Sequence, residues 1–343
     1  MASTARVRGK DDPQGSLTSA EAILTVDGLS TTFKTHDGPV PAVRDVSFEL
    51  RRGEFLGLVG ESGCGKSTVL MSILRLLPEN ADMSAGSLDF DGSDLLGLSD
   101  EAIRRLRGRR ISLIPQRPMS SLSPVATIER QLKWYLQRDG ARNAQELTEA
   151  IESMLERVGL RAATERLSGY PYQFSGGQLQ RMLIAIAALV GEPDVLMADE
   201  PTTTLDVTVQ AQVLSLLMEA RERLGLSVII VTHDLGVIAQ TCDRVAVMYG
   251  GRLVEMADVN TLFHEPRHPY TIALLDSLPS RHRRGEPLTS ITGSAIGSNL
   301  LDGCPFAPRC PSVMDRCRTE VPERQTVSDT VVRCHLYSEA PDG

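Results

Sequence analysis

Residues 55–68 read FLGLVGESGCGKST, a short apolar run followed directly by a glycine-rich turn. The turn, GESGCGKST at residues 60–68, fits the pattern G-x-x-x-x-G-K-[ST], and a helical pattern comes after it. Glycines let the backbone curl so that successive N–H groups face a phosphate, and the N-terminus of the next helix adds partial positive charge. This succession of strand, loop and helix predicts an α/β nucleotide-binding fold.

The side chains of this loop suit binding of a magnesium–nucleotide complex. Lys66 is expected to reach the β- and γ-phosphates, and the Ser67 hydroxyl to coordinate Mg²⁺. Cys64 is expected to be a tolerated small residue, yet sensitive to alkylation or oxidation because a helix N-terminus lowers a thiol pKa. The residues expected to bind ATP here are Gly60, Glu61, Ser62, Gly63, Cys64, Gly65, Lys66, Ser67 and Thr68.

Composition limits what the rest of the chain can be. The chain has 343 residues, of which 41% are hydrophobic and 23% charged, as is usual for a globular protein. Its net charge of −8 argues against non-specific nucleic-acid binding, which depends on clustered Lys and Arg. The longest apolar run, residues 182–190, is far shorter than the roughly 20 residues of a membrane span, so a membrane role needs a partner.

Hydrophobic patterns divide the chain into predicted elements. Residues 23–52 carry alternating β-branched and aromatic positions around a Gly-Pro turn, which predicts an antiparallel sheet. Residues 100–169 are mostly polar and helix-prone, and a helical subdomain is expected at about 117–180. The apolar runs VLMAD, SVIIVTH and RVAVMYGG, separated by helical patterns, predict buried strands of a mostly parallel core sheet.

Changes in composition suggest three parts. Residues 1–20 lack the apolar core of a secretory signal and are expected to form a disordered extension. The nucleotide-binding domain is expected at residues 21–265. Past residue 265 the sequence becomes rich in Pro, Arg and Ser and then carries cysteines, so a small C-terminal extension is expected at residues 266–343.

The segment YQFSGGQLQR, residues 172–181, has a serine and two glycines where a helix is expected to begin. Such a start presents a hydroxyl and open backbone amides to an anion. Together with the phosphate loop, it resembles the signature sequence of ABC ATPases. The resemblance implies a P-loop NTPase that works as a dimer, because in that family the signature contacts the γ-phosphate held by the opposite subunit. The core of the signature here is Ser175, Gly176, Gly177 and Gln178.

Two acidic residues follow the apolar run VLMA. Asp199 stands at the expected end of a buried strand, where a carboxylate can hold Mg²⁺ through water. Resemblance to the same family implies that Glu200 is the general base that polarises the attacking water. Further along, Asp206 matches the family's D-loop, which crosses the dimer interface. His233 matches the switch histidine, which contacts the γ-phosphate.

Two more residues are candidates for the nucleotide site. Gln116, in SLIPQRPM, matches the family's Q-loop glutamine, which reaches the Mg²⁺ and water while its loop faces the membrane partner. Relatives usually carry an acidic residue next, whereas this chain has Arg117. Phe33 is expected either to stack on adenine or to be a core residue of its strand. Since every motif is intact and in the family's order, the resemblance implies an active ATPase.

The C-terminal part narrows the resemblance. EPRHPYTIALLDSLPS at 265–280 and CPFAPRCP at 304–311 resemble the tail of oligopeptide and dipeptide importer ATPases; Ser123 departs from the family's usual asparagine. The resemblance implies a peripheral subunit on the cytoplasmic face of a bacterial membrane that powers uptake of di- or oligopeptides. Its implied partners are a second ATPase subunit, two transmembrane permeases and an extracytoplasmic binding protein. A nickel-complex importer, an exporter subunit and a soluble ABC ATPase are the alternatives.

Four of the six cysteines lie near the C-terminus, where four thiolates can ligate a [4Fe–4S] cluster or a structural zinc ion. Their spacing lacks the short C-x₂₋₄-C pairs typical of zinc sites, which favours iron–sulfur, with zinc second and unliganded thiols third. Some members of the resembled family carry such a cluster in this segment. The cysteines concerned are Cys304, Cys310, Cys317 and Cys334.

Overall fold

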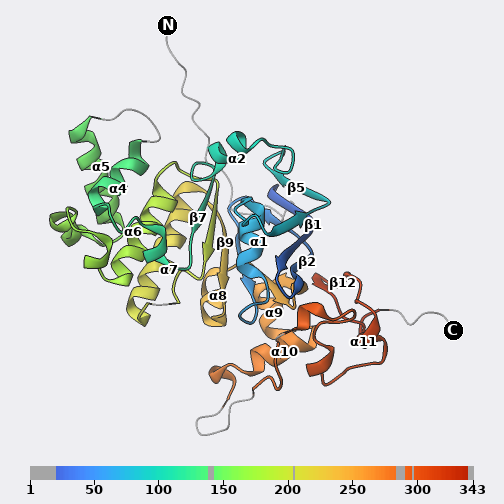
Figure 1. The fold of residues 1–343 in the computed structure, drawn as a ribbon. Helices are drawn as coiled ribbons and strands as arrows, with labels where there is room; N and C mark the ends of the chain where they lie inside the picture. Colours follow the sequence, from blue (N-terminus) through green and yellow to red (C-terminus); the bar gives the residue numbers. More distant parts are fainter. Residues whose placement is uncertain (1–20, 138–142, 204, 283–289, 296, 339–343) are drawn as a thin grey trace.

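The computed structural model describes residues 21–137, 143–203, 205–282, 290–295 and 297–338; the extension expected at residues 1–20 lies outside these ranges. The described residues form two β-sheets, with a group of helices to one side and a C-terminal region to the other (Figure 1). The larger sheet has eight strands in the order β12-β13-β11-β10-β3-β9-β8-β7. They are β3 (Phe55–Val59), β7 (Ile111–Ile114), β8 (Val195–Asp199), β9 (Ser227–Thr232), β10 (Arg244–Tyr249), β11 (Arg252–Asp258), β12 (Gln325–Val327) and β13 (Thr330–Val332).

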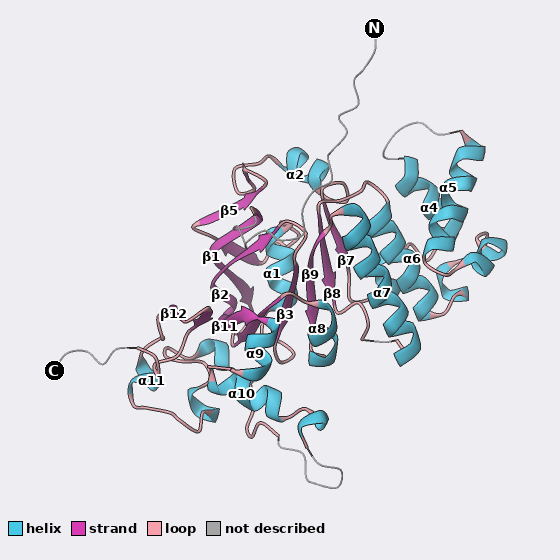
Figure 2. Ribbon diagram, turned by 180° about the vertical axis from the view of Figure 1, so that it is seen from behind, coloured by secondary structure: helices cyan, strands magenta, loops and turns pink. Residues whose placement is uncertain are grey.

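The centre of this sheet is parallel, as the three apolar runs predict. β10, β3, β9, β8 and β7 pair with one another in parallel register. Every residue of β3 and β9 is buried, which is the pattern of strands covered on both faces. Helices lie on either side of these strands (Figure 2). The carboxyl ends of β3, β8 and β9 lead into the residues that the sequence analysis selects for the nucleotide site.

One core strand lies where a helix was expected. β7 has the sequence ISLI, pairs with β8 and interrupts the helix-prone stretch at residues 100–169. The strand is only four residues long and lies between two arginines and the Pro115-Gln116 pair. Averaged with these polar neighbours, its four residues give no clear apolar pattern. The expectation of helix is therefore wrong for this strand. β7 matters for the site because Gln116 follows its end.

The second sheet is antiparallel, as predicted. β1 and β2 form a long hairpin whose turn lies at residues 36 and 37, just before the Gly-Pro pair noted in the sequence. Both β4 and β5 pair antiparallel with β1. The buried residues of this sheet pack with those of β3 and α1 in one hydrophobic cluster. Its strands are β1 (Ala22–Thr35), β2 (Gly38–Arg51), β4 (Ala81–Ser84), β5 (Ser87–Phe90) and β6 (Ser93–Asp94).

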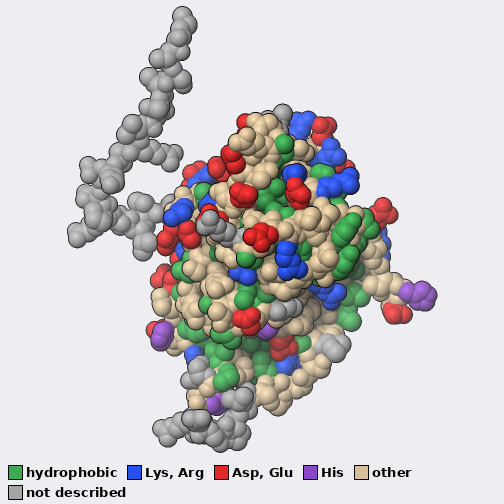
Figure 3. All heavy atoms as spheres, turned by 90° about the vertical axis from the view of Figure 1, so that its left-hand side faces the viewer, with side chains coloured by type: hydrophobic (Ala, Val, Ile, Leu, Met, Phe, Trp, Pro, Cys, Tyr) green, Lys and Arg blue, Asp and Glu red, His purple; other side chains and the backbone are tan. Residues whose placement is uncertain are grey.

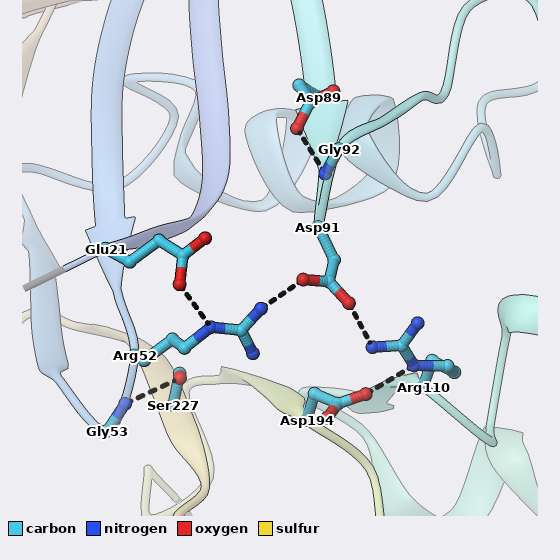
Figure 4. Close-up of polar contacts among 9 residues, drawn as sticks. All are labelled: Glu21, Arg52, Gly53, Asp89, Asp91, Gly92, Arg110, Asp194 and Ser227. Carbon is cyan, nitrogen blue, oxygen red and sulfur yellow. Dashed lines mark hydrogen bonds and ion pairs between the residues drawn. The ribbon is translucent and has the colours of Figure 1, made fainter.

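A chain of ion pairs connects the two sheets (Figure 4). Arg52, which follows β2, contacts Glu21 and Asp91, and Arg110, which precedes β7, contacts Asp91 and Asp194. Hydrogen bonding from Arg110 and the charge of Arg52 hold the pKa of Asp91 below its usual value. Partly exposed pairs contribute little free energy individually, so the buried apolar contacts provide most of the stability.

The helices to the left in Figure 1 pack around an apolar core of their own. α3, α4 and α5 lie within the helical subdomain expected at about 117–180, and α6 begins near its end. Seen from this side, exposed hydrophobic side chains are interspersed with charged ones of both signs (Figure 3). The helices before the C-terminal region are α1 (Lys66–Ile73), α2 (Asp100–Leu106), α3 (Pro118–Ser121), α4 (Ile128–Gln137), α5 (Ala144–Arg157), η1 (Arg161–Arg166), η2 (Pro171–Gln173), α6 (Gly176–Leu189), α7 (Val207–Leu224) and α8 (Leu235–Thr241).

The C-terminal region is joined to the core sheet. β13 pairs with β11, and Cys304, Phe306 and Cys317 belong to the main hydrophobic cluster. The domain boundary expected after residue 265 falls between α9 and α10. No helix among the described residues is both long enough and apolar enough to cross a membrane. Before the boundary lies α9 (Val259–His264), and after it come α10 (Pro269–Asp276), η3 (Pro279–Arg281), η4 (Ser298–Leu300), η5 (Ala307–Arg309) and α11 (Arg316–Thr319).

Candidate nucleotide-binding and hydrolysis site

The phosphate loop lies between β3 and α1, as predicted. Gly60 and Gly65 have φ angles of 152° and 105°, and a Cβ atom there would approach the Met248 and Ala42 carbonyl oxygens to 2.2 and 2.3 Å. A residue with a side chain at either position would force the backbone apart. These two glycines therefore let the loop curl closely against β10 and β2.

Lys66 stabilises the curl from inside. Its buried Nζ donates hydrogen bonds to the carbonyl oxygens of Gly60 and Glu61, at 2.8 and 3.0 Å. Ser62 and Ser67, in contrast, are exposed. The loop thus has a fixed inner side that carries the ammonium group and an open side where phosphate oxygens can enter.

Cys64 differs from the expectation of a reactive thiol. Its side chain is buried, and burial raises the pKa of the thiol, while the nearby Lys66 ammonium only partly opposes this change. Burial thus opposes the lowering of the thiol pKa on which the expected sensitivity to alkylation depends, and the sensitivity itself stays a prediction.

The structure brings two of the three side chains expected at the Mg²⁺, Ser67 and Asp199, into contact, whereas the third, Gln116, contacts Glu200. The Ser67 hydroxyl donates to Asp199 Oδ1 at 2.9 Å, although the two residues are 132 positions apart. Burial raises the pKa of Asp199, the Ser67 hydrogen bond opposes that change, and the neighbouring Glu200 charge reinforces it. A hydroxyl and a carboxylate oxygen in contact are hard donors of the kind that Mg²⁺ prefers.

Glu200 is the centre of a second group of contacts. Its Oε2 accepts hydrogen bonds from Gln116 Nε2 at 3.0 Å and from the Thr203 hydroxyl at 2.8 Å. His233 Nδ1 lies 3.6 Å from the other carboxylate oxygen. Burial would raise the pKa of Glu200, but Thr203, His233 and Gln116 together outweigh it, so the pKa lies below its usual value. Glu200 is thus ionised at neutral pH, as a general base must be.

The backbone of Glu200 is also unusual. Its φ angle is 45°, in the left-handed region that costs a residue with a side chain about 1 kcal/mol or more. Its N–H donates to the Val231 carbonyl oxygen at 2.9 Å, which ties this turn to β9, the strand that precedes His233. Backbone strain at a carboxylate held by three polar side chains fits a functional position.

The signature and D-loop residues begin helices. The Ser175 hydroxyl accepts from Gln178 N–H and the Gln178 side chain accepts from Ser175 N–H, which forms a capping box for α6. Asp206 caps α7 in a similar way. Ser175, Gly176 and Asp206 are exposed, and α6 and α1 lie to opposite sides of β7, β8 and β9 in both ribbon views (Figures 1 and 2). Within one chain, the signature therefore stands apart from the phosphate loop.

Phe33 lies at the far end of β1, opposite Val40 of β2 and Ala81 of β4. Its side chain is half-buried. This placement allows either role that the sequence leaves open, so stacking on adenine stays a prediction.

Sequence reasoning missed two residues that contact the phosphate loop. The Arg309 guanidinium donates to Glu61 Oε2 at 2.9 Å, and the Tyr270 hydroxyl accepts from the Glu61 N–H at 3.0 Å. Both lie in the C-terminal segments that carry the importer resemblance. Their sequence separation from the loop, 248 and 209 residues, leaves no local pattern from which the contact could be found.

The four C-terminal cysteines line one small cavity, together with His268. All of them are free thiols. Within the described part of the chain, no three His, Cys, Asp or Glu side chains are arranged tightly enough to hold a metal ion. The four thiols predicted to act together therefore line one cavity, and among the described residues they do not form a recognisable metal site.

Two family models match the chain. The model described as "ABC transporter" matches residues 43–203, and that described as "Oligopeptide/dipeptide transporter, C-terminal region" matches residues 254–317. The dipeptide transport ATP-binding protein DppD of Bacillus subtilis (strain 168) is 46% identical over 324 residues, covering 93% of this chain and 96% of that protein. The chain belongs to the ABC transporter family. It is the ATP-binding, ATP-hydrolysing component of such a system.

Other comparisons agree with this assignment. The oligopeptide transport ATP-binding protein OppD of Escherichia coli (strain K12) is 44% identical over 306 residues, covering 88% of this ABC ATPase and 90% of that protein. Among solved structures, the dimeric post-hydrolysis state of the ATP-binding cassette MJ0796, bound to ADP and Pi, matches with a TM-score of 0.62 and 28% identity. That match covers 69% of this chain and 98% of the other, and it confirms the P-loop ABC ATPase fold.

Proposed function

We propose that this ABC ATPase powers uptake of di- or oligopeptides into a bacterial cell, from the cytoplasmic face of the membrane. The C-terminal region carries the proposal, because residues 254–317 match the oligopeptide/dipeptide transporter model. Relatives 46% and 44% identical over most of the chain are named for dipeptide and oligopeptide transport. We assign the choice of cargo to an extracytoplasmic binding protein, with nickel complexes as the alternative cargo.

The contacts of the site support distinct roles for its residues. The phosphate loop and Lys66 bind the phosphates, and Glu200 accepts a proton from the attacking water. Gln116 and His233, both beside the Glu200 carboxylate, orient that water and contact the γ-phosphate. Ser67 and Asp199, with Gln116, would hold Mg²⁺, which when bound neutralises phosphate charge.

A second ATPase subunit, identical or similar, completes the proposed site. Ser175, Gly176 and Asp206 are exposed and stand apart from their own phosphate loop, which suits contact with a nucleotide held by the partner. The MJ0796 cassette of the same fold is dimeric in its ADP- and Pi-bound state. Two chains would enclose ATP between the loop of one and the signature of the other, and would reopen after hydrolysis.

The permeases would dock beside the loop that carries Gln116. A cavity of about 310 Å³ lies here, lined by Pro115, Ser121 and Tyr135 among others. Met119 of α3 and Val125, which follows that helix, are exposed, and neighbouring exposed apolar side chains are typical of a protein interface. Since Gln116 contacts Glu200, movement of a docked permease segment would reach the hydrolysis site directly.

Peptide uptake by living cells tests the transport proposal. Replacing the gene at its own locus by the Glu200→Gln variant should abolish uptake of radiolabelled di- and tetrapeptides, because the transporter would bind ATP without hydrolysing it. The peptide length affected would give the subclass. Normal peptide uptake, in a strain whose other peptide importers have been deleted, would contradict the proposal and direct attention to nickel uptake and to export.

The C-terminal cysteines support a further component of the proposal, a [4Fe–4S] cluster. Four cysteines around one cavity provide the thiolate ligands that such a cluster needs. Among the described residues no three His, Cys, Asp or Glu side chains form a group that could hold a metal ion, so the proposal rests on the shared cavity and on the chemistry of the thiols. His268 lines the same cavity and has a buried Nε2 atom without a hydrogen-bond partner, which fits a missing group beside it. Bound there, the cluster would cross-link the tail.

Metal analysis of the purified protein tests the cluster. Prepared without oxygen, the full chain should be brown and contain about four iron atoms, and Cys317→Ala should lose most of them because one ligand is gone. Cys242→Ala is the matched control, since Cys242 is also buried but lies outside the segment. A colourless protein with one zinc ion would make zinc, rather than an iron–sulfur cluster, the preferred assignment. A metal-free protein would mean that the four cysteines are unliganded thiols.

A further inference from the structure

Glu61, the second residue of the phosphate loop, is held at three points. Its carbonyl oxygen accepts from Lys66 Nζ, inside the loop, at 3.0 Å. Its other two contacts come from the C-terminal region: the carboxylate accepts from Arg309 Nη1 at 2.9 Å, and the N–H donates to the Tyr270 hydroxyl at 3.0 Å. The loop is therefore shaped partly by residues more than 200 positions away in the sequence.

Arg309 is well suited to hold a fixed position. Its side chain is only 6% exposed, and its guanidinium also donates to the Tyr249 hydroxyl at 3.0 Å and to the carbonyl oxygens of Ile291 and Thr292 at 3.1 and 2.9 Å. The planar guanidinium donates to all of these oxygen atoms at once, so the Arg309 side chain has little freedom to rotate. Arg309 thus presents its charge to Glu61 from a rigid support.

Tyr270 is equally constrained. It is fully buried, and its ring centroid lies 4.5 Å from that of Tyr249 and 5.4 Å from that of Phe306. Tyr249 ends β10, whereas Phe306 lies between Cys304 and Cys310. This aromatic cluster connects the core sheet, α10 and the cysteine segment, and it fixes the hydroxyl that receives the Glu61 N–H.

We propose that Arg309 and Tyr270 are positioning residues for ATP binding. By holding the carboxylate and the N–H of Glu61, they keep the first turn of the phosphate loop in the shape that receives the phosphates. The role belongs to the ATPase reaction itself and depends neither on the cargo nor on a cluster. Loss of the contact should therefore weaken ATP binding more than it slows turnover at saturating ATP.

Equilibrium binding of radiolabelled ATP with Mg²⁺ to the purified full chain provides the test. Glu61→Ala and Arg309→Ala should each raise the dissociation constant about tenfold, the scale of a lost hydrogen bond to a charged group. Tyr270→Phe, which removes only the hydroxyl, should raise it about fivefold. The kcat at saturating ATP should stay within about threefold of the unmodified protein, while KM for ATP rises. Arg309→Lys, which keeps the charge, should recover part of the affinity.

A double-mutant cycle separates positioning from general destabilisation. If Arg309 acts through Glu61, the combined Glu61→Ala/Arg309→Ala variant should bind ATP no more weakly than either single variant. Arg281→Ala is the matched control, because Arg281 also pairs with a carboxylate of the C-terminal region, Asp276, without touching the loop. Its ATP affinity should be unchanged.

Two results would overturn the proposal. One is an unchanged dissociation constant for Glu61→Ala, whose partly exposed side chain can be removed without emptying the core and so keeps the test valid if Arg309→Ala fails to fold. The other is full additivity in the cycle. Because the assay involves no transport, either result would leave the peptide-import proposal untouched, and failure of peptide uptake would equally leave this inference standing.

Discussion

Glu200→Gln should lower the rate of ATP hydrolysis at least about 10²-fold, the usual scale of lost general-base catalysis, while ATP binding is retained. The amide keeps the shape of the side chain and can still accept hydrogen bonds from Gln116 and Thr203. It cannot take the proton of the attacking water. Phosphate release and equilibrium ATP binding, measured on the same purified protein, would show the two effects separately.

Glu222→Gln is the control for this experiment, because Glu222 is an exposed residue of α7 far along the helix from Asp206. It should leave both quantities unchanged. Turnover near the unmodified rate in Glu200→Gln would remove Glu200 from the role of general base and leave its strained backbone without an explanation.

Lys66→Ala should also reduce hydrolysis at least about 10²-fold, the scale of losing one charged donor to the developing transition state. Unlike Glu200→Gln, it should reduce ATP binding as well. The buried ammonium holds the Gly60 and Glu61 carbonyl oxygens and is expected to contact the phosphates, so its loss should remove a ligand contact and loosen the loop. Radiolabelled ATP binding and phosphate release are again the two measurements.

Lys133→Ala provides the comparison for Lys66→Ala. Lys133 pairs with Glu129 on α4, in the helical subdomain rather than in the phosphate loop. Its removal should change neither binding nor hydrolysis in the isolated chain. Retention of tight ATP binding by Lys66→Ala would mean that the backbone amides of the loop suffice and that the ammonium acts in the chemical step alone.

Local patterns predicted the main elements well where they were long or strongly apolar. β8, β9 and β10 follow directly from their buried runs, and the hairpin of β1 and β2 from its alternation. β7 was missed because its four residues lie in a polar stretch, and pairing with β8 together with burial stabilises them as a strand. For so short a segment, tertiary contacts outweigh intrinsic preference.

The lowered pKa expected of the Cys64 thiol was wrong for a related reason. The rule that a helix N-terminus lowers a thiol pKa uses only local sequence. Burial against β10 and β2 is a tertiary effect, and the cost of placing a charge there is larger. Exposure of this position cannot be deduced from the loop motif, because it depends on which distant strands pack against the loop.

The sequence by itself determined the nucleotide chemistry of this protein. Residue type and short spacing are enough to identify the phosphate loop, the signature, the Asp199-Glu200 pair and His233 without coordinates. Tertiary structure alone decided which residues meet. It placed Ser67 against Asp199, Gln116 against Glu200 and, across 248 residues, Arg309 against Glu61. Contacts between distant residues depend on how sheets and helices pack together, and no local pattern records that packing.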